Sequence, residues 1–121
     1  MMEVGTRFRV LRRLPPSSRV TQPPLMLAPG TLVTIGERSS EWPAFVLVAS
    51  PTGATGWVPE RLLERVGETR VAKENYDTTT LDPAPGEVLT GLDEDRDAGW
   101  IWCERKPGEA GWFPVSYLEE L

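Results

Sequence analysis

Two stretches of twenty residues decide the fold of this chain: FVLVASPTGATGWVPERLLE at Phe45–Glu64 and WIWCERKPGEAGWFPVSYLE at Trp100–Glu119. They align without a gap at a constant offset of 55. Six aligned pairs are identical, namely Gly53/Gly108, Gly56/Gly111, Trp57/Trp112, Pro59/Pro114, Leu63/Leu118 and Glu64/Glu119. Upstream, PGTLVT at Pro29–Thr34 matches PGEVLT at Pro85–Thr90 at an offset of 56. Two matching blocks in the same order indicate an internal duplication.

Each copy reads as short strands joined by tight turns. The expected strands, rich in β-branched and aromatic residues, are Thr31–Ile35, Phe45–Ala49, Thr55–Val58, Glu87–Leu92, Trp100–Arg105 and Ala110–Phe113. Pro51-Thr52-Gly53 and Lys106-Pro107-Gly108 suit hairpin turns. Glu60-Arg61-Leu62 is too short for an α-helix and predicts a single 3₁₀ turn. The sequence therefore predicts an all-β protein made of two tandem domains, at residues 1–66 and 70–121, joined by a linker at about 66–71.

Composition narrows the possible functions. The 121 residues include no histidine and a single cysteine, Cys103, so the commonest general base, the commonest metal ligand and an internal disulfide are all missing. No Gly-rich phosphate loop or metal-ligand cluster is present, and we expect no enzyme activity, no catalytic residue, no cofactor and no metal site. No apolar run is long enough for a membrane span, and MMEVGTRFRV does not resemble a secretory signal, so a cytoplasmic location is expected.

Charge is unevenly distributed along the chain. Residues 1–66 carry eight basic and five acidic side chains, whereas residues 72–121 carry four basic and twelve acidic ones. Such asymmetry indicates two domains with different surfaces. It also disfavours nucleic acid as a partner, because the half with more aromatic residues is the strongly negative one.

The second copy resembles a Src-homology-3 (SH3) domain. Ala72-Lys73-Glu74-Asn75-Tyr76 stands where that family has its opening ALYDY motif, and Pro85-Gly86-Glu87 resembles its diverging turn. Gly99–Cys103 is similar to the tryptophan-pair strand, and Gly111–Leu118 is close to the closing signature. The first copy resembles the family less, with Val10–Leu14 in place of ALYDY. As a whole the chain resembles small bacterial tandem SH3-type proteins, and the resemblance implies an all-β fold of two tandem five-stranded SH3-like barrels.

The resemblance implies a peptide-binding groove in the second copy. Its shelf of rings would be formed by Tyr76, Trp100, Pro114 and Tyr117. A carboxylate from Asp77, Asp95 or Asp97 would select a positive charge on the ligand. Such rings bind a polyproline II segment, which is already extended and loses little entropy on binding. The equivalent first-copy positions, Leu14, Phe45, Pro59 and Leu62, have no hydroxyl and favour an interdomain or partner contact.

These observations leave two main hypotheses for function. The first is a non-catalytic binding module whose second copy binds a Pro-rich or Lys/Arg-containing segment of a protein or peptide partner. The second is a structural or assembly subunit whose barrels form one rigid body with no free peptide groove. Cell-wall recognition is a more distant alternative. The oligomeric state is not encoded in these patterns.

Overall fold

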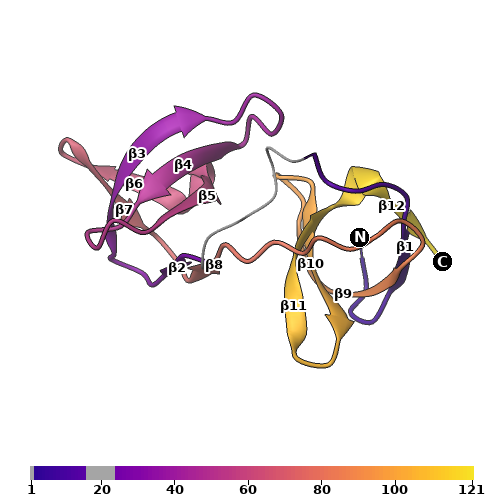
Figure 1. Cartoon of the computed structure of the whole chain (residues 1–121). Helices are drawn as coiled ribbons and strands as arrows, with labels where there is room; N and C mark the ends of the chain where they lie inside the picture. The colour runs from indigo at the N-terminus through magenta and orange to yellow at the C-terminus, as the bar shows by residue number, and fades with distance from the viewer. Residues whose placement is uncertain (1, 16–23) are drawn as a thin grey trace. The chain divides into compact units, whose positions relative to one another are not determined.

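The computed structural model describes residues 2–15 and 24–121, and these residues form strands and two single-turn 3₁₀ helices. The elements in chain order are β1 (Arg7–Val10), β2 (Met26–Leu27), β3 (Leu32–Arg38), β4 (Phe45–Ala49), β5 (Thr55–Pro59), η2 (Glu60–Leu62), β6 (Leu63–Val66), β7 (Thr69–Ala72), β8 (Tyr76–Asp77), β9 (Val88–Asp95), β10 (Trp100–Lys106), β11 (Glu109–Pro114), η3 (Val115–Tyr117) and β12 (Leu118–Glu120). The predicted all-β class is confirmed, and so is the 3₁₀ turn at Glu60–Leu62. Figure 1 shows the course of the chain through these elements.

The chain divides into two compact units that differ from the predicted domains. Unit 1 combines Met1–Gln22 with Thr79–Leu121, and unit 2 is the intervening segment Pro23–Thr78. The predicted boundaries at residues 66 and 70 therefore do not coincide with the units. The expected linker at 66–71 is occupied instead by the end of β6 and most of β7, which pair with each other.

Unit 2 is built on an antiparallel sheet with the strand order β5-β4-β3-β7-β6. Buried aliphatic side chains from every strand of this sheet, and from β2 and η2, form its core: Leu25, Leu27, Val33, Val46, Val48, Val58, Leu62, Leu63 and Ala72. A short β2–β8 pair belongs to the same unit. All strands of this sheet come from one continuous stretch of sequence, so unit 2 is an insertion within unit 1.

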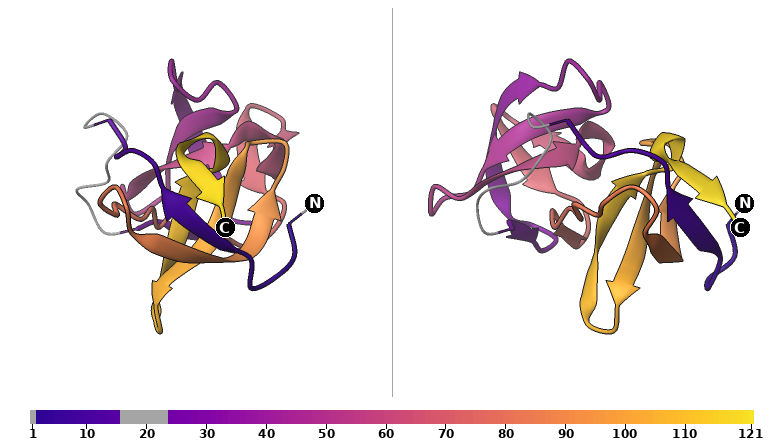
Figure 2. Two further views of the ribbon diagram at one scale, coloured as in Figure 1. Left: turned by 90° about the vertical axis from the view of Figure 1, so that its right-hand side faces the viewer. Right: turned by 45° about the vertical axis from the view of Figure 1, so that its right-hand side comes forward.

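Unit 1 is built on a sheet with the order β11-β10-β9-β1-β12. Its strands come from both ends of the described chain, and Figure 2 shows the indigo β1 lying between the orange β9 and the yellow β12. The backbone amide of Val10 donates to the carbonyl of Glu87 at 2.8 Å, and that of Leu11 donates to Tyr117 at 2.8 Å. The N-terminal strand is therefore a central part of the C-terminal sheet.

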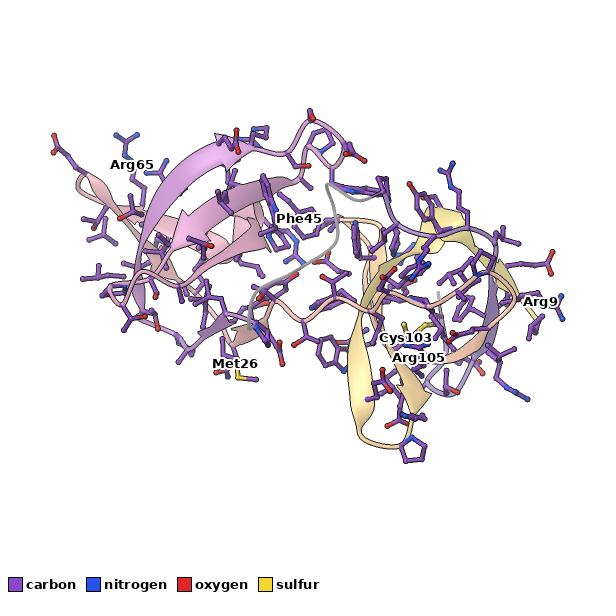
Figure 3. All side chains as sticks on the ribbon, viewed as in Figure 1. Arg9, Met26, Phe45, Arg65, Cys103 and Arg105 are labelled. Atoms are coloured by element: carbon purple, nitrogen blue, oxygen red, sulfur yellow. The ribbon has the colours of Figure 1, made fainter. Side chains whose placement is uncertain are left out.

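The duplication seen in the sequence is reproduced in the strand register. Phe45 pairs with Pro59 and Val48 with Gly56, while Trp100 pairs with Pro114 and Cys103 with Gly111. The offset of 55 is thus kept between the β4–β5 and β10–β11 hairpins. As expected for equivalent core positions, Val48 and Cys103 are both buried, with 1% and 0% exposure. Figure 3 shows Cys103 within unit 1, with Arg9 at the periphery.

The first strands of the two sheets are exchanged relative to a simple tandem repeat. Val10 of β1 pairs with Leu118, and Ala72 of β7 pairs with the equivalent residue Leu63. Likewise Phe8 pairs with Leu89, and Arg70 pairs with Val33. β1 therefore has in unit 1 the place that β7 has in unit 2, although β1 precedes the first copy in the sequence and β7 precedes the second.

Side-chain volume explains why β1 belongs to the C-terminal sheet. Phe8, which is 8% exposed, lies over Gly91 together with Met2: a Cβ atom at Gly91 would come within 2.5 Å of the Met2 sulfur and 3.0 Å of the Phe8 ring. In unit 2 the equivalent pair is Arg70 and Ile35, since Ile35 pairs with Val48 as Gly91 pairs with Cys103. If β1 and β7 changed places, Phe8 would lie against Ile35 and Arg70 would lie over Gly91. Overpacking and cavities both destabilise a core, so this complementarity favours the observed pairing.

The distribution of charged residues also favours the pairing of β1 with the C-terminal sheet. Residues 1–22 carry five arginines and one acidic side chain, whereas residues 79–121 carry ten acidic and three basic side chains. Arg9 pairs with Glu119 at 3.1 Å and Arg13 with Asp82 at 3.2 Å. The negative charge of residues 79–121 is thus partly compensated inside unit 1. Exposed pairs of this kind stabilise only weakly, so they support the packing of Phe8 rather than replace it.

Truncating Phe8 tests which sheet the N-terminal strand stabilises. We expect Phe8→Ala to lower the free energy of unfolding of unit 1 by about 3 kcal/mol, because it leaves a cavity over Gly91. Hydrogen exchange measured by mass spectrometry should become faster in β9 and β12. The matched control is Arg70→Ala at the equivalent position, which should make hydrogen exchange faster in β3 and β6 alone. Faster hydrogen exchange in β3 and β6 of the Phe8→Ala protein would contradict the pairing of β1 with β9 and β12.

Candidate ligand-binding site

Three of the predicted shelf residues lie in unit 1, and we call this set the aromatic row: Trp100, Pro114 and Tyr117. Trp100 pairs directly with Pro114 across β10 and β11, so the two side chains share a face of the sheet. The amide of Val115 donates to the carbonyl of Gly99 at 2.9 Å and holds η3 beside the start of β10. Tyr117 is the last residue of η3.

The rings of the aromatic row are largely buried. Trp100 and Tyr117 are each 6% exposed. The Tyr117 ring packs edge-on against Phe113, with centroids 6.1 Å apart, and the guanidinium carbon of Arg12 lies 3.9 Å from the Tyr117 centroid. A partner approaching Tyr117 would therefore meet Arg12 as well as the phenol ring.

The two candidate carboxylates near Trp100 have different environments. Asp95 pairs with Trp100 across β9 and β10 and is 7% exposed. Its carboxylate accepts a hydrogen bond from the amide of Ala98 at 3.1 Å, and its carbonyl accepts one from Gly99 at 2.9 Å. Asp95 thus closes the turn between these strands, which is a structural task. Asp97 is exposed in the same turn and is the better placed of the two to meet a charged ligand.

Tyr76 and Asp77 lie in the other unit. They form β8, which pairs with β2, and Tyr76 packs against the hydrophobic core of unit 2. The structure thus does not group them with Trp100 in one unit as the sequence predicted. The physical reason is the exchange of first strands, because these residues follow β7 and β7 belongs to the sheet of unit 2.

Because β1 is the first strand of the sheet in unit 1, the residues that follow β1 become candidate site residues there. The sequence analysis did not identify them. Because Val10 is equivalent to Ala72, Arg12 has the position of Glu74 and Leu14 that of Tyr76. Leu14 is 1% exposed, whereas Arg12 is exposed beside Tyr117. The available signal was the basic character of the N-terminal segment, which matches the acidic residues after position 79.

The single cysteine of the chain, Cys103, is a buried core residue. Residues 2–15 and 24–121 contain no group of three or more His, Cys, Asp or Glu that could hold a metal ion. Burial raises the pKa of the Cys103 thiol to about 12, which keeps it protonated near neutral pH. Its sulfur lies 3.6 Å from the Gly111 carbonyl oxygen, as a packed core group. No helix among the described residues has the length and hydropathy for a membrane span.

Comparison with known proteins gives this arrangement a family context. Residues 72–121 match the family described as "Variant SH3 domain". Formin-binding protein 1-like from Homo sapiens is 37% identical over 46 residues, covering 38% of this chain and 8% of that protein. The protein of the same name from Xenopus laevis is 42% identical over 40 residues, covering 33% of this chain and 7% of that protein. The chain therefore spans less than a tenth of the length of these curated relatives. No solved structure matches.

A variant SH3 domain is thus present in the chain, and domains of this class are typically non-catalytic protein-interaction modules. The matched residues cross the boundary between the two units, because residues 72–78 lie in unit 2 and residues 79–121 in unit 1. The stretch that resembles one domain in sequence therefore contributes residues to both units.

Burial of Cys103 predicts slow thiol chemistry. At pH 8 the folded protein should react with a thiol reagent far more slowly than the same protein in urea, because the native thiol is both protonated and inaccessible. The raised pKa also predicts a stability contribution that is present below the unfolded value of 9.0 and is lost as the pH rises towards about 12. Rapid modification of the folded protein at pH 8 would contradict this placement of Cys103.

Proposed function

We propose that this chain is a non-catalytic binding protein whose aromatic row in unit 1 binds a Pro-rich, Lys/Arg-containing segment of a partner protein. The observation that carries the proposal is the cross-strand pair of Trp100 and Pro114, followed by Tyr117 in η3, in a unit that contains most of the variant SH3 match. The bacterial and cytoplasmic setting indicated by the sequence, and the description of each unit as an SH3-like barrel, belong to the same proposal.

The chemistry of the row suits an extended ligand. Aromatic rings and prolines are the side chains that bind a polyproline II helix, which needs little ordering on binding. In this structure Trp100 and Tyr117 are each 6% exposed and Pro114 is less than 2% exposed, so a ligand would meet the edges of these side chains. Asp97, exposed in the turn that precedes Trp100, supplies a negative charge at this end of the row. A ligand arginine or lysine beside the prolines would meet that charge. The names of the curated relatives, which describe them as formin-binding, agree with protein partners in general.

A structural role is the second candidate, and the low exposure of the rings favours it. Trp100 and Tyr117 are 6% exposed, and Phe45, the equivalent of Trp100 in unit 2, is 7% exposed. Under this alternative the rings only stabilise the fold, and no peptide binds to them. The two candidates differ in whether a change at Trp100 alters binding beyond its effect on stability.

Titration of two matched variants distinguishes these functions. We expect Trp100→Ala to weaken binding of a Pro-rich peptide with a terminal arginine by about 1–3 kcal/mol, as the loss of an aromatic anchor does. Phe45→Ala removes a ring of similar burial from the equivalent position in unit 2 and should leave the affinity unchanged. Isothermal titration calorimetry gives the affinities, and urea unfolding shows that both variants remain folded.

Equal affinities of wild type and Trp100→Ala for the peptide would reject the aromatic row as the binding site. The absence of binding by any of the three proteins would instead support the structural role.

A further inference from the structure

The strongest unassigned feature is the guanidinium of Arg12 on the ring of Tyr117. We propose that Arg12 makes the Tyr117 end of the aromatic row a carboxylate-recognition point, so that the preferred partner segment carries an aspartate or glutamate at that end. This inference rests on the proposed function, because it assumes that a peptide lies along the row.

The position of Arg12 is fixed by the exchanged first strand. Immediately before it, the amide of Leu11 donates to the carbonyl of Tyr117 at 2.8 Å, which anchors the end of β1 beside η3. The Arg12 guanidinium then lies 3.9 Å from the Tyr117 centroid. In the simple tandem arrangement Glu74 would have this place, so the exchange reverses the sign of the charge beside Tyr117.

Arg12 differs from its neighbours in how its charge is compensated. Arg9 pairs with Glu119 at 3.1 Å, and Arg13 donates through two nitrogen atoms to the two carboxylate oxygens of Asp82, at 3.2 and 3.4 Å. In the described part of the chain the guanidinium of Arg12 contacts an aromatic ring instead of a carboxylate. A ring contact engages the face of the guanidinium and leaves its N–H edge available.

This N–H edge suits a bidentate contact with a carboxylate, a geometry in which arginine is preferred over lysine. Asp97 is exposed in the turn that precedes Trp100, whereas Arg12 lies on Tyr117, the last residue of η3. A peptide that runs from Trp100 to Tyr117 would therefore meet an acidic residue before Trp100 and a basic residue at Tyr117. The ligand that fits is a proline-rich segment with a basic residue at one end and an acidic residue at the other.

The test uses two synthetic peptides with the same Pro-rich core and one terminal arginine, carrying either glutamate or glutamine at the end opposite the arginine. Each is made in both chain directions, because a polyproline II helix can lie along a groove either way. We expect the glutamate peptide to bind the wild-type chain about fivefold more tightly in calorimetric titrations at low salt, as expected for a bidentate pair near the surface. The advantage should shrink in 0.5 M salt, since screening weakens an exposed pair.

Arg12→Gln should remove the preference for glutamate, and Arg12→Glu should reverse it. Arg12→Lys keeps the charge and should retain only part of the preference, because lysine cannot form the bidentate contact. The control is Arg7→Gln, an exposed arginine of the same segment, which should leave the preference intact. Circular dichroism and urea unfolding confirm that each variant is folded.

The possible failures are distinguishable. If both peptides bind the wild-type chain equally, or if the preference survives in Arg12→Gln, the role of Arg12 is refuted and the proposed function stands. If neither peptide binds, the proposed function fails and this inference fails with it.

Discussion

The packing of Phe8 over Gly91 is the constraint on which the rest of this structure depends. A glycine in the middle of β9 leaves space that the side chains of Met2 and Phe8 fill, since a Cβ atom there would lie 2.5 Å from the Met2 sulfur and 3.0 Å from the Phe8 ring. At the equivalent place in unit 2 the strand from residues 69–72 brings Arg70, and the sheet already carries Ile35. The size of the side chain at each position thus favours the observed pairing of first strands.

The first strand that joins each sheet also determines which side chains each unit carries. Unit 1 receives Arg12 and Leu14 beside the aromatic row, and unit 2 receives Tyr76 and Asp77 beside its own core. A variant SH3 match over residues 72–121 is therefore compatible with a binding row whose first-strand residues come from positions 10–14. The strongly acidic C-terminal segment gains a basic strand, so unit 1 is less negative than residues 72–121 taken alone.

Much of the fold could be predicted from the sequence because local patterns specify it. The matching blocks predict the hairpins Phe45–Pro59 and Trp100–Pro114 with equivalent registers, and β-branched and aromatic residues mark their strands. The choice of first strand could not be predicted in this way, since Val10 and Ala72 both suit the same apolar position and sequence order favours the nearer strand. The deciding residues, Phe8 and Gly91, are 83 positions apart and become informative only when the register is known. The predicted site was affected accordingly: Trp100, Pro114 and Tyr117 lie in unit 1, but Tyr76 and Asp77 lie in unit 2.

A disulfide between engineered cysteines tests the exchange of first strands most directly. Arg9 and Glu119 are exposed and stand directly opposite on β1 and β12, at a Cα separation that antiparallel pairing sets within the range of a disulfide. In a background where Cys103→Val copies the equivalent Val48, the Arg9→Cys/Glu119→Cys protein should oxidise to an internal disulfide, detected by mass spectrometry of its linked peptides. The matched pair Arg9→Cys/Glu64→Cys places the second cysteine at the equivalent position of unit 2 and should remain reduced. A disulfide in the second pair and none in the first would show that the N-terminal strand completes the nearer sheet and would contradict this account.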